Sequence, residues 1–292
     1  MKQFVHAILS VAAIATLAGC AAGKPQDTLF GTTDPLRDAA RKDIEAKIEN
    51  FKAEKAESVC KFSSALAEQE FLAIPAVAQQ NGFKTLAYDM ESLDGKTKVK
   101  YSFATGRRMK VVVTDAAGKV SYAQILNGND AYTSTDGIEY AKITLPEHLN
   151  ELRLRYDMAM AFAKNAKNVS LKTFQMKQNG KVIAEEAVEQ DLDGERCLKF
   201  DIELSNKDYT ATVTAYISAD KARNQLATAV KQINGLAQPD IMVKCSRFFV
   251  QDGIVFPGFI TTDSKDAPQM TIKNLTVNGK IPTLDFVPDM VK

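Results

Sequence analysis

A shortage of histidine limits the catalytic schemes that this chain can use. His6 lies in an apolar leader, so the remainder of the 292 residues holds one imidazole, His148. Catalytic and metal sites that need two imidazoles are therefore excluded. A serine or cysteine nucleophile would need His148 as its base, yet no GxSxG turn presents one. We expect His148 to be a surface residue and the protein not to be an enzyme.

Paired carboxylates are present, but their setting favours a solvating role. Glu185 with Glu186, and Asp191 with Asp193, flank segments that we predict to be hairpins. Such spacing alone does not indicate glycoside hydrolysis. The acidic turns lack the dense ligand spacing of a calcium loop, and the sequence has no glycine-rich phosphate cradle. We expect no metal and no cofactor.

The chain has four cysteines, at positions 20, 60, 197 and 245, and they are too far apart in the sequence for a CxxC redox site or a zinc ribbon. In an oxidising compartment, Cys60 can pair with Cys197 or with Cys245 and so tie an N-terminal arm to the strands. The sequence is equally compatible with no bridge, because pairing depends on the distances between Cα atoms.

Composition and charge describe an ordinary globular protein. The chain is 45% apolar and 25% charged, which excludes collagen-like and wholly disordered classes. Its 37 Lys and Arg residues balance 36 Asp and Glu residues. The net charge therefore gives no indication of a nucleic-acid partner.

Residues 1–19 have the pattern of a secretory signal peptide. Lys2 precedes an apolar run, Ala7 to Ala18, that is too short to span a bilayer. The run ends in Leu17-Ala18-Gly19-Cys20, which resembles a bacterial lipobox. This resemblance implies cleavage before Cys20 and acylation of that residue, which would anchor the protein to a membrane. The alternative is an ordinary signal peptide followed by a chance cysteine.

The segment after the leader predicts a tether. Residues 20–33 contain Gly23, Pro25 and Gly31 and are typical of a flexible linker. An Asp after the acylated cysteine would resemble an inner-membrane retention signal, but Ala21 stands there. We expect a lipid-anchored protein of the bacterial cell envelope, at the outer membrane and facing the periplasm.

The remaining chain, residues 34–292, is predicted to be one domain that begins with a helical arm over 34–80. Thr33-Asp34-Pro35 is a helix start, followed by apolar residues at helical spacing from Leu36 to Phe51. A second helix is predicted from Val59 to Ala73, ending near Ile74 because Pro75 disfavours helical geometry in the residue before it.

From Phe83 onward the apolar period changes from helical to alternating. Val99, Tyr101 and Phe103 alternate with polar residues, and Leu198 to Leu204 repeat the pattern. Nine of the 15 glycines follow Asn or Asp, as in tight hairpins. The fold class is therefore α+β, with a large antiparallel sheet of about ten or eleven strands.

A central helix, residues 145–165, separates the two groups of strands. It begins at Leu145-Pro146 and carries more apolar surface than one packing face requires. We expect it to cover a cavity, and its lid candidates are Leu154, Met158, Met160 and Phe162. The segment 218–233 fits either a helix or a strand, and we favour a strand.

The order of these features resembles the LolA/LolB-like superfamily of envelope lipoprotein and lipid carriers, which includes LppX-like proteins. The local matches are the segments 126–132 (LNGNDAY) and 249–257 (FVQDGIVFP), with Ile281-Pro282 and Phe286-Val287-Pro288 near the end. The resemblance implies an incomplete antiparallel barrel, covered on its concave side by helices, with an apolar cavity that receives acyl chains. No basic residue matches a cargo-binding position, so no single binding residue is carried over.

The apolar residues at every second position of the predicted strands are the candidate lining of that cavity. Its members are Leu86, Tyr88, Met90, Val99, Tyr101, Phe103, Met109, Val111, Leu198, Phe200, Ile202 and Leu204. Inward-facing sheet residues more often pack as ordinary core.

Two functions fit these features. The first is a membrane-anchored protein, held by Cys20, that binds the acyl chains of lipids or lipoproteins for transport or acceptance. The alternative is a non-enzymatic interaction or sensor lipoprotein with a filled core and an envelope protein partner.

Overall fold

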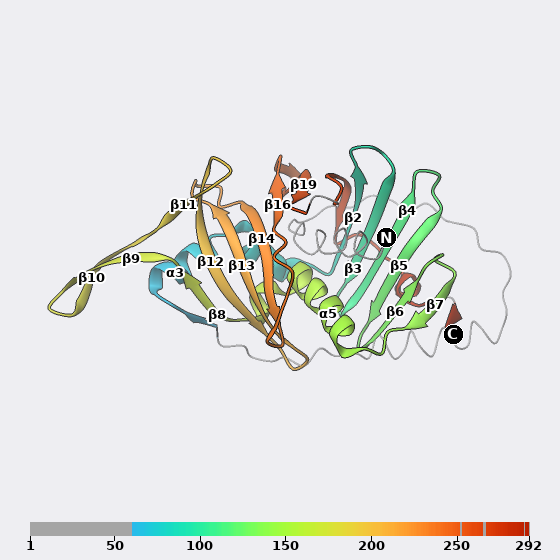
Figure 1. Ribbon diagram of the computed structural model, residues 1–292, viewed down its shortest axis with the longest axis horizontal. Helices are drawn as coiled ribbons and strands as arrows, with labels where there is room; N and C mark the ends of the chain where they lie inside the picture. The colour runs from blue at the N-terminus through green and yellow to red at the C-terminus, as the bar shows by residue number, and fades with distance from the viewer. Residues whose placement is uncertain (1–59, 252, 265–266, 289, 292) are drawn as a thin grey trace. The chain divides into compact units, whose positions relative to one another are not determined.

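A computed structural model describes residues 60–251, 253–264, 267–288 and 290–291 (Figure 1). The predicted leader, the linker, the helix from Asp34 to Phe51 and the acylation candidate Cys20 lie outside these residues. The described chain is mostly β, with one large, mixed and largely antiparallel sheet and few helices. The prediction of a large antiparallel sheet is thus confirmed, although the helical share of an α+β fold is small. The predicted number of about ten or eleven strands is wrong, because the sheet of the described residues contains 17, several of them only two to five residues long.

The chain forms two compact units, which are described separately. Among the described residues, unit 1 consists of 60–82 and 157–269, and unit 2 of 83–156 and 270–291. The boundary between them along the chain falls within the central helix, α5 (Pro146–Met160).

Unit 2 is an antiparallel meander. Each strand from β2 to β7 pairs with the next, β20 pairs with the outer side of β2, and β21 adds to β7 in parallel. Its elements are β2 (Thr85–Ser92), β3 (Thr97–Ala104), β4 (Arg108–Asp115), β5 (Val120–Asn127), β6 (Asp130–Ser134), β7 (Glu139–Lys142), β20 (Met270–Val277), β21 (Met290–Val291) and the 3₁₀ helix η2 (Thr283–Phe286).

Unit 1 is a second set of paired strands. β8, β12, β13, β14, β16 and β19 pair in this order and antiparallel, while β1 pairs in parallel with β8. Its strands are β1 (Lys61–Phe62), β8 (Ala166–Leu171), β9 (Thr173–Gln178), β10 (Lys181–Ala187), β11 (Glu189–Leu192), β12 (Glu195–Ser205), β13 (Thr210–Ser218), β14 (Gln225–Ile233), β15 (Leu236–Ala237), β16 (Val243–Ser246), β17 (Phe249–Gln251), β18 (Ile254–Phe256) and β19 (Phe259–Thr262).

Short helices of unit 1 replace the second predicted helix. They are α3 (Ala65–Leu72), α4 (Pro75–Gln79) and η1 (Gln80–Gly82). The predicted central helix, residues 145–165, is divided into α5 and the short α6 (Phe162–Asn165). Val59, the predicted start of the second helix, lies outside the described residues. The helix predicted over Lys61 and Phe62 is wrong, because these residues pair with β8 and helix α3 begins only after Ser64, whose Oγ accepts from the Ala67 N–H at 3.1 Å. Pro75 occupies the first turn of a new helix, where its missing N–H costs nothing.

The hairpin signals in the sequence correspond to turns in the structure. Asn179-Gly180 and Asp193-Gly194 both have positive φ angles at each residue, 51° and 74° in the first pair and 55° and 86° in the second. These are the backbone angles that two-residue hairpins need. The strand that we favoured within 218–233 is present as β14, which begins at Gln225.

Candidate functional site

An apolar layer covers one face of the sheet in unit 2. The register aligns side chains across neighbouring strands, so that Tyr88 pairs with Tyr101, Tyr101 with Val111, and Val111 with Gln124. A parallel row runs through Leu86, Phe103 and Met109, and a third joins Met90 to Val99. All eight lining candidates of this unit therefore lie on one face, and all are buried: Leu86, Tyr88, Met90, Val99, Tyr101, Phe103, Met109 and Val111.

Aromatic rings form the centre of this layer. The centroids of Tyr88 and Tyr101 lie 5.0 Å apart with an interplanar angle of 21°, and those of Tyr101 and Phe103 lie 6.1 Å apart at 7°. Rings at such distances contribute about 0.5–1.5 kcal/mol per pair beyond the area that they bury. The layer is thus built around a stack of aromatic rings.

One polar group within this layer has no partner. The Tyr101 hydroxyl is buried and makes no hydrogen bond within the described structure. Burial raises the pKa of Tyr101 well above its ordinary value, and the positive charge of Arg155 opposes this only in part. The hydroxyl therefore stays protonated and remains a hydrogen-bond donor. Most buried polar groups are hydrogen-bonded, so an unpaired one at the centre of an apolar layer needs an explanation.

Arg155 brings a positive charge to the same layer. This side chain of α5 is almost fully buried, and its guanidinium donates to Gln124 Oε1 at 3.1 Å and to Glu151 Oε1 at 3.0 Å. Gln124 lies in the row that contains Tyr101. The next residue of the helix, Tyr156, donates to the Ala104 carbonyl at 3.1 Å and so fixes this turn of α5 on the sheet of unit 2.

This arrangement combines apolar area with polar groups suited to an anionic or hydroxylated head. A guanidinium and a phenolic hydroxyl both donate hydrogen bonds, and neither is a nucleophile at neutral pH. The sequence analysis did not identify Arg155 or Gln124. The available signal was the second apolar row of the helix, which implied that more than one face of α5 is buried.

The lining candidates of unit 1 form their own buried core. Leu198, Phe200, Ile202 and Leu204 alternate along β12 and are buried, and the Phe200 ring lies 6.2 Å from that of Phe71 on α3. Phe71 also contacts the ring of Phe162 at 6.2 Å. These residues pack against other side chains of their own unit.

The lid candidates are buried as well, and the elements around them explain why. Met158, Met160 and Phe162 belong to unit 1, where Gln80 Nε2 donates to the Met158 carbonyl at 2.9 Å. Leu154 belongs to unit 2 and is buried there. Sequence reasoning missed Asp157, a buried carboxylate that accepts from the Tyr209 hydroxyl and from Asn206 Nδ2, both at 2.8 Å.

The three described cysteines are free thiols. Lys61, next to Cys60, pairs with Asn168, and Asn168 pairs with Glu203 on β12. Cys197 lies on β12 six residues before Glu203, or about 20 Å along the strand, whereas a disulfide needs Cα atoms within about 7 Å. Cys245 lies on β16, separated from β12 by β13 and β14. The register thus gives no support to a bridge from Cys60 to either residue.

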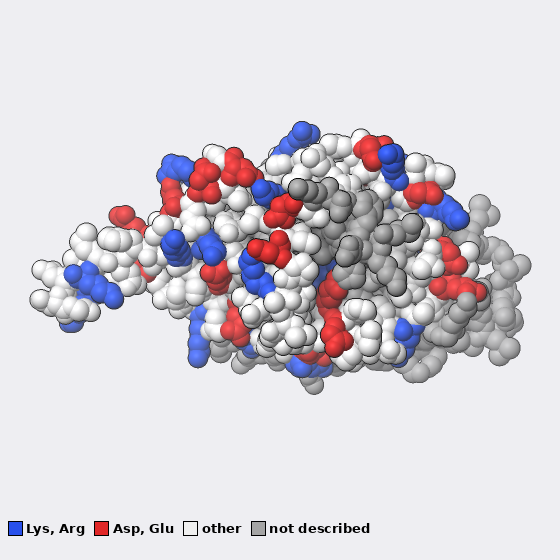
Figure 2. All heavy atoms as spheres, in the orientation of Figure 1, with Lys and Arg blue, Asp and Glu red and all other residues white. Residues whose placement is uncertain are grey.

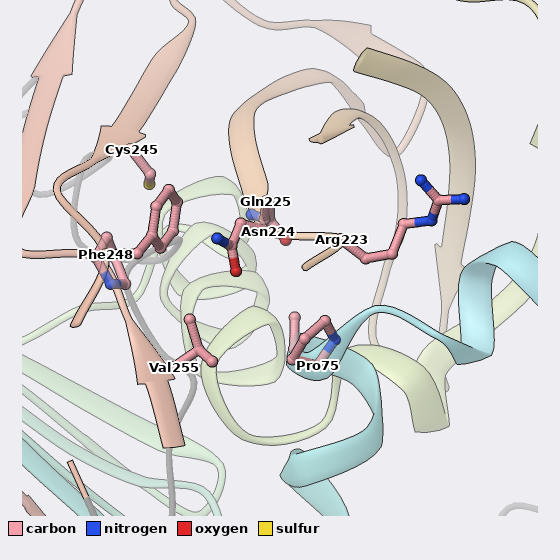
Figure 3. A pocket seen from close by; sticks show the side chains of 9 residues that line it. Pro75, Arg223, Asn224, Gln225, Cys245, Phe248 and Val255 are labelled. Carbon is pink, nitrogen blue, oxygen red and sulfur yellow. The ribbon is translucent and has the colours of Figure 1, made fainter. Parts of the chain in front are cut away.

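A small pocket lies in unit 1 (Figure 3). Pro75, Asn224, Cys245, Phe248 and Val255 are among its lining residues, and its volume is about 20 Å³. A space of that size admits about one water molecule and no hydrocarbon chain. Arg223, at its edge, is held by Glu70, whose Oε2 lies 2.7 Å from the arginine Nε. This pocket is therefore not the acyl site that the sequence predicts.

Two further observations concern the described residues. His148 is exposed near the start of α5, as expected. Within the described ranges, no group of three metal-ligating side chains comes together, and no helix is both long and apolar enough to cross a bilayer.

The comparisons give similarities to solved structures at low sequence identity. No protein-family model matches the sequence, and no curated protein matches it. A DUF1329 family protein from Desulfovibrio piger is 10% identical, with a TM-score of 0.47 over 75% of this chain and 96% of that one. A LolA superfamily protein from Nitrosomonas europaea is 12% identical, with a TM-score of 0.41 over 70% and 89%. The Mycobacterium tuberculosis lipoprotein LppX is 11% identical, with a TM-score of 0.28 over 74% and 99%.

Proposed function

We propose that this protein is a membrane-anchored envelope lipoprotein that binds the acyl chains of lipids or lipoproteins and serves in their transport or acceptance. In this proposal, acylated Cys20 holds the protein at the outer membrane, facing the periplasm. The apolar layer of unit 2 receives the hydrocarbon chain. No covalent chemistry is involved.

The observation that carries the proposal is the unpartnered Tyr101 hydroxyl near the buried charge of Arg155. A layer that served only as core would gain stability from phenylalanine at position 101, because a buried polar group costs free energy unless it is hydrogen-bonded. An amphipathic ligand gives both donors a use. Its tail contacts the aromatic rings, and its carboxylate or phosphate accepts from the two donors.

The finer architecture is part of the same proposal. It is an incomplete barrel with helices across its concave side, and it rests on the sequence resemblance. The complete burial of the lining candidates means that an acyl chain must displace protein side chains when it enters. Binding therefore requires a conformational change, and its free energy must exceed the cost of that opening.

The same complete burial favours a second candidate function. If the layer never opens, the fold is a rigid, filled module, and the protein acts as an interaction or sensor lipoprotein of the envelope. Crosslinking in cells followed by pulldown would then recover an envelope protein partner, and isolated protein would bind no lipid.

Titration with a fluorescent fatty acid separates the two functions. The full chain from residue 20 is used with Cys20→Ser, so that no covalent acyl chain interferes. We expect saturable binding that Arg155→Met weakens. Ile125→Val is the matched control, since Ile125 is buried in a cluster with Ala123 and Tyr140 on the opposite face of β5. Absence of uptake, together with no lipid in organic extracts of the purified protein, would contradict the acyl-binding proposal.

A further inference from the structure

Strands β9 and β10 form a two-stranded sheet of their own, which we call the ribbon (residues 172–188). Two strands pair with the same edge of β12. The first part of β12, as far as Leu198, pairs with β11, and the part from Phe200 onward pairs with β8. The chain leaves that edge between these two segments, where the Lys172 N–H donates to the Lys199 carbonyl at 3.4 Å and the Val188 N–H to the Lys172 carbonyl at 2.8 Å. Figure 1 shows the ribbon projecting from β8 and β12 of unit 1.

The two faces of the ribbon differ in chemistry. Thr173 Oγ1 and Gln175 Nε2 both donate to Glu185 Oε1, at 2.8 and 3.0 Å, so one face is polar and internally hydrogen-bonded. Strand alternation puts Phe174 and Met176 on the other face, where Ala184 pairs with Met176 and Glu186, toward the base, pairs with Phe174. Ile183 follows Val182, which pairs with Lys177 on the polar face, and so points to the apolar side.

This apolar face is exposed. Phe174 is 63% accessible, Met176 53% and Ile183 55%, with no cover from the described part of the chain. Large apolar side chains grouped on one face of a projecting element mark an interaction surface rather than chance exposure. The opposite face holds one exposed large apolar side chain, Val182 at 49%, beside Gln175 and Lys177, so the ribbon is more apolar on the face of Phe174 and Met176.

Charge is segregated along the ribbon. The outer part, residues 176–184, carries Lys177 and Lys181 and no acidic residue, whereas Glu185 and Glu186 lie toward the base. Figure 2 shows blue side chains on the outer part of this projection. The exposed apolar face thus ends in a positively charged tip, which complements an anionic surface.

The edges of the ribbon disfavour another β-strand as the partner. A register shift between Val182 and Ala184 interrupts β10, and the two lysines flank the turn. Bulges and lysines are features by which exposed strands resist pairing with further strands. The surface that remains available is the apolar face, which suits a partner without strand geometry.

From these observations we propose that the ribbon docks on the surface of a bilayer that contains anionic phospholipid, with Phe174, Met176 and Ile183 in the interfacial region and the two lysines at the headgroups. The inference goes beyond acyl-chain binding and does not depend on it. Interfacial elements bind through buried apolar area together with attraction to anionic lipids.

Vesicle co-sedimentation tests the proposal. The full chain from residue 20 with Cys20→Ser is mixed with vesicles of phosphatidylcholine alone or with added phosphatidylglycerol. We expect preferential binding to the anionic vesicles. Lys177→Gln with Lys181→Gln should weaken it roughly thirtyfold, from the usual contribution of a lysine near an anionic surface. Met176→Ser with Ile183→Ser should weaken it at least about tenfold.

A matched control is Leu236→Ser with Val250→Ser, which removes two equally exposed apolar side chains elsewhere in unit 1 and should leave binding unchanged. Thermal unfolding of every variant should match that of the parent, because all these side chains are exposed. The proposal is overturned if the parent does not bind anionic vesicles, or if the ribbon variants bind as the parent does. It is also overturned if Met176→Ser with Ile183→Ser abolishes a dimer seen by analytical ultracentrifugation while vesicle binding persists. Fatty-acid uptake measured in parallel should not respond to the ribbon variants, so failure here is distinguishable from failure of the acyl site.

Discussion

Replacing Tyr101 with phenylalanine should make the protein more stable and a poorer ligand binder. The change removes only a hydroxyl that is buried and unpartnered. Mutational data place the cost of such a group at about 1–3 kcal/mol. Attraction between the hydroxyl dipole and Arg155 offsets part of this cost, so we expect the free energy of unfolding to rise by about 1 kcal/mol. Such a gain raises the melting temperature by roughly 2–4 °C for a chain of this size.

Tyr209 provides the matched control for this substitution. Its hydroxyl is also buried but donates to Asp157 Oδ2 at 2.8 Å. Tyr209→Phe leaves a buried carboxylate short of a donor and should lower the free energy of unfolding by about 1–3 kcal/mol. The same chemical change thus has opposite signs at the two positions. Calorimetry and urea denaturation measure both.

Ligand titration completes the test. A hydrogen bond to a charged ligand group contributes about 1.5–3 kcal/mol, so Tyr101→Phe should weaken the binding of a fatty acid at least about tenfold. If Tyr101→Phe destabilises the protein as much as Tyr209→Phe does, the hydroxyl has a partner and the reasoning fails. If Tyr101→Phe raises the stability but leaves the affinity for the fatty acid unchanged, the Tyr101 hydroxyl is an unsatisfied group of the core and does not contact the ligand.

Three further predictions concern other positions. Arg155→Met should lower the free energy of unfolding, measured by urea denaturation, by about 1–3 kcal/mol, because Gln124 and Glu151 lose their partner. The control Arg196→Met, at an exposed position, should change it by less than about 0.5 kcal/mol. Equal effects of the two substitutions would refute the role of Arg155 as a buried, hydrogen-bonded residue. Burial raises the pKa of Cys245 to about 12, so its thiol stays protonated and unreactive toward Ellman's reagent at neutral and mildly alkaline pH; rapid labelling of the native protein would contradict this. Gly258→Ala places a Cβ 2.6 Å from the Arg247 carbonyl oxygen and should lower the melting temperature. The control Gly82→Ala adds a Cβ that meets nothing within 4 Å, so the melting temperature should not fall. Similar melting temperatures for the two variants would contradict the close approach of Gly258 to Arg247.

The strands were predictable because their signal is local. Alternation over Val99, Tyr101 and Phe103 assigns one face of a strand without knowledge of its neighbours. The hairpin turns followed from the conformational freedom of Asn-Gly and Asp-Gly pairs. Which residues pair across the sheet, and hence the row that joins Tyr101 to Gln124, depends on register and was not available from the pattern.

Long-range contacts account for what the sequence did not predict. Lys61 and Phe62 read as helix, but their pairing with residues 168 and 169 on β8 draws them into the sheet. In the same way, Arg155 and Asp157 look like solvated residues of an amphipathic helix. Both are buried, Arg155 within unit 2 and Asp157 within unit 1, and each has a specific polar partner there. The separation of the cysteines likewise follows from register alone.

The central claim is that acyl chains bind at the apolar layer of β2, β3 and β4. Photocrosslinking with a diazirine-labelled fatty acid, followed by peptide mass spectrometry of the Cys20→Ser chain, tests it most directly. We predict saturable labelling on peptides that contain Tyr88, Tyr101 and Met109, with competition by unlabelled fatty acid. Labelling that does not saturate, or that falls only on other peptides, would contradict the claim.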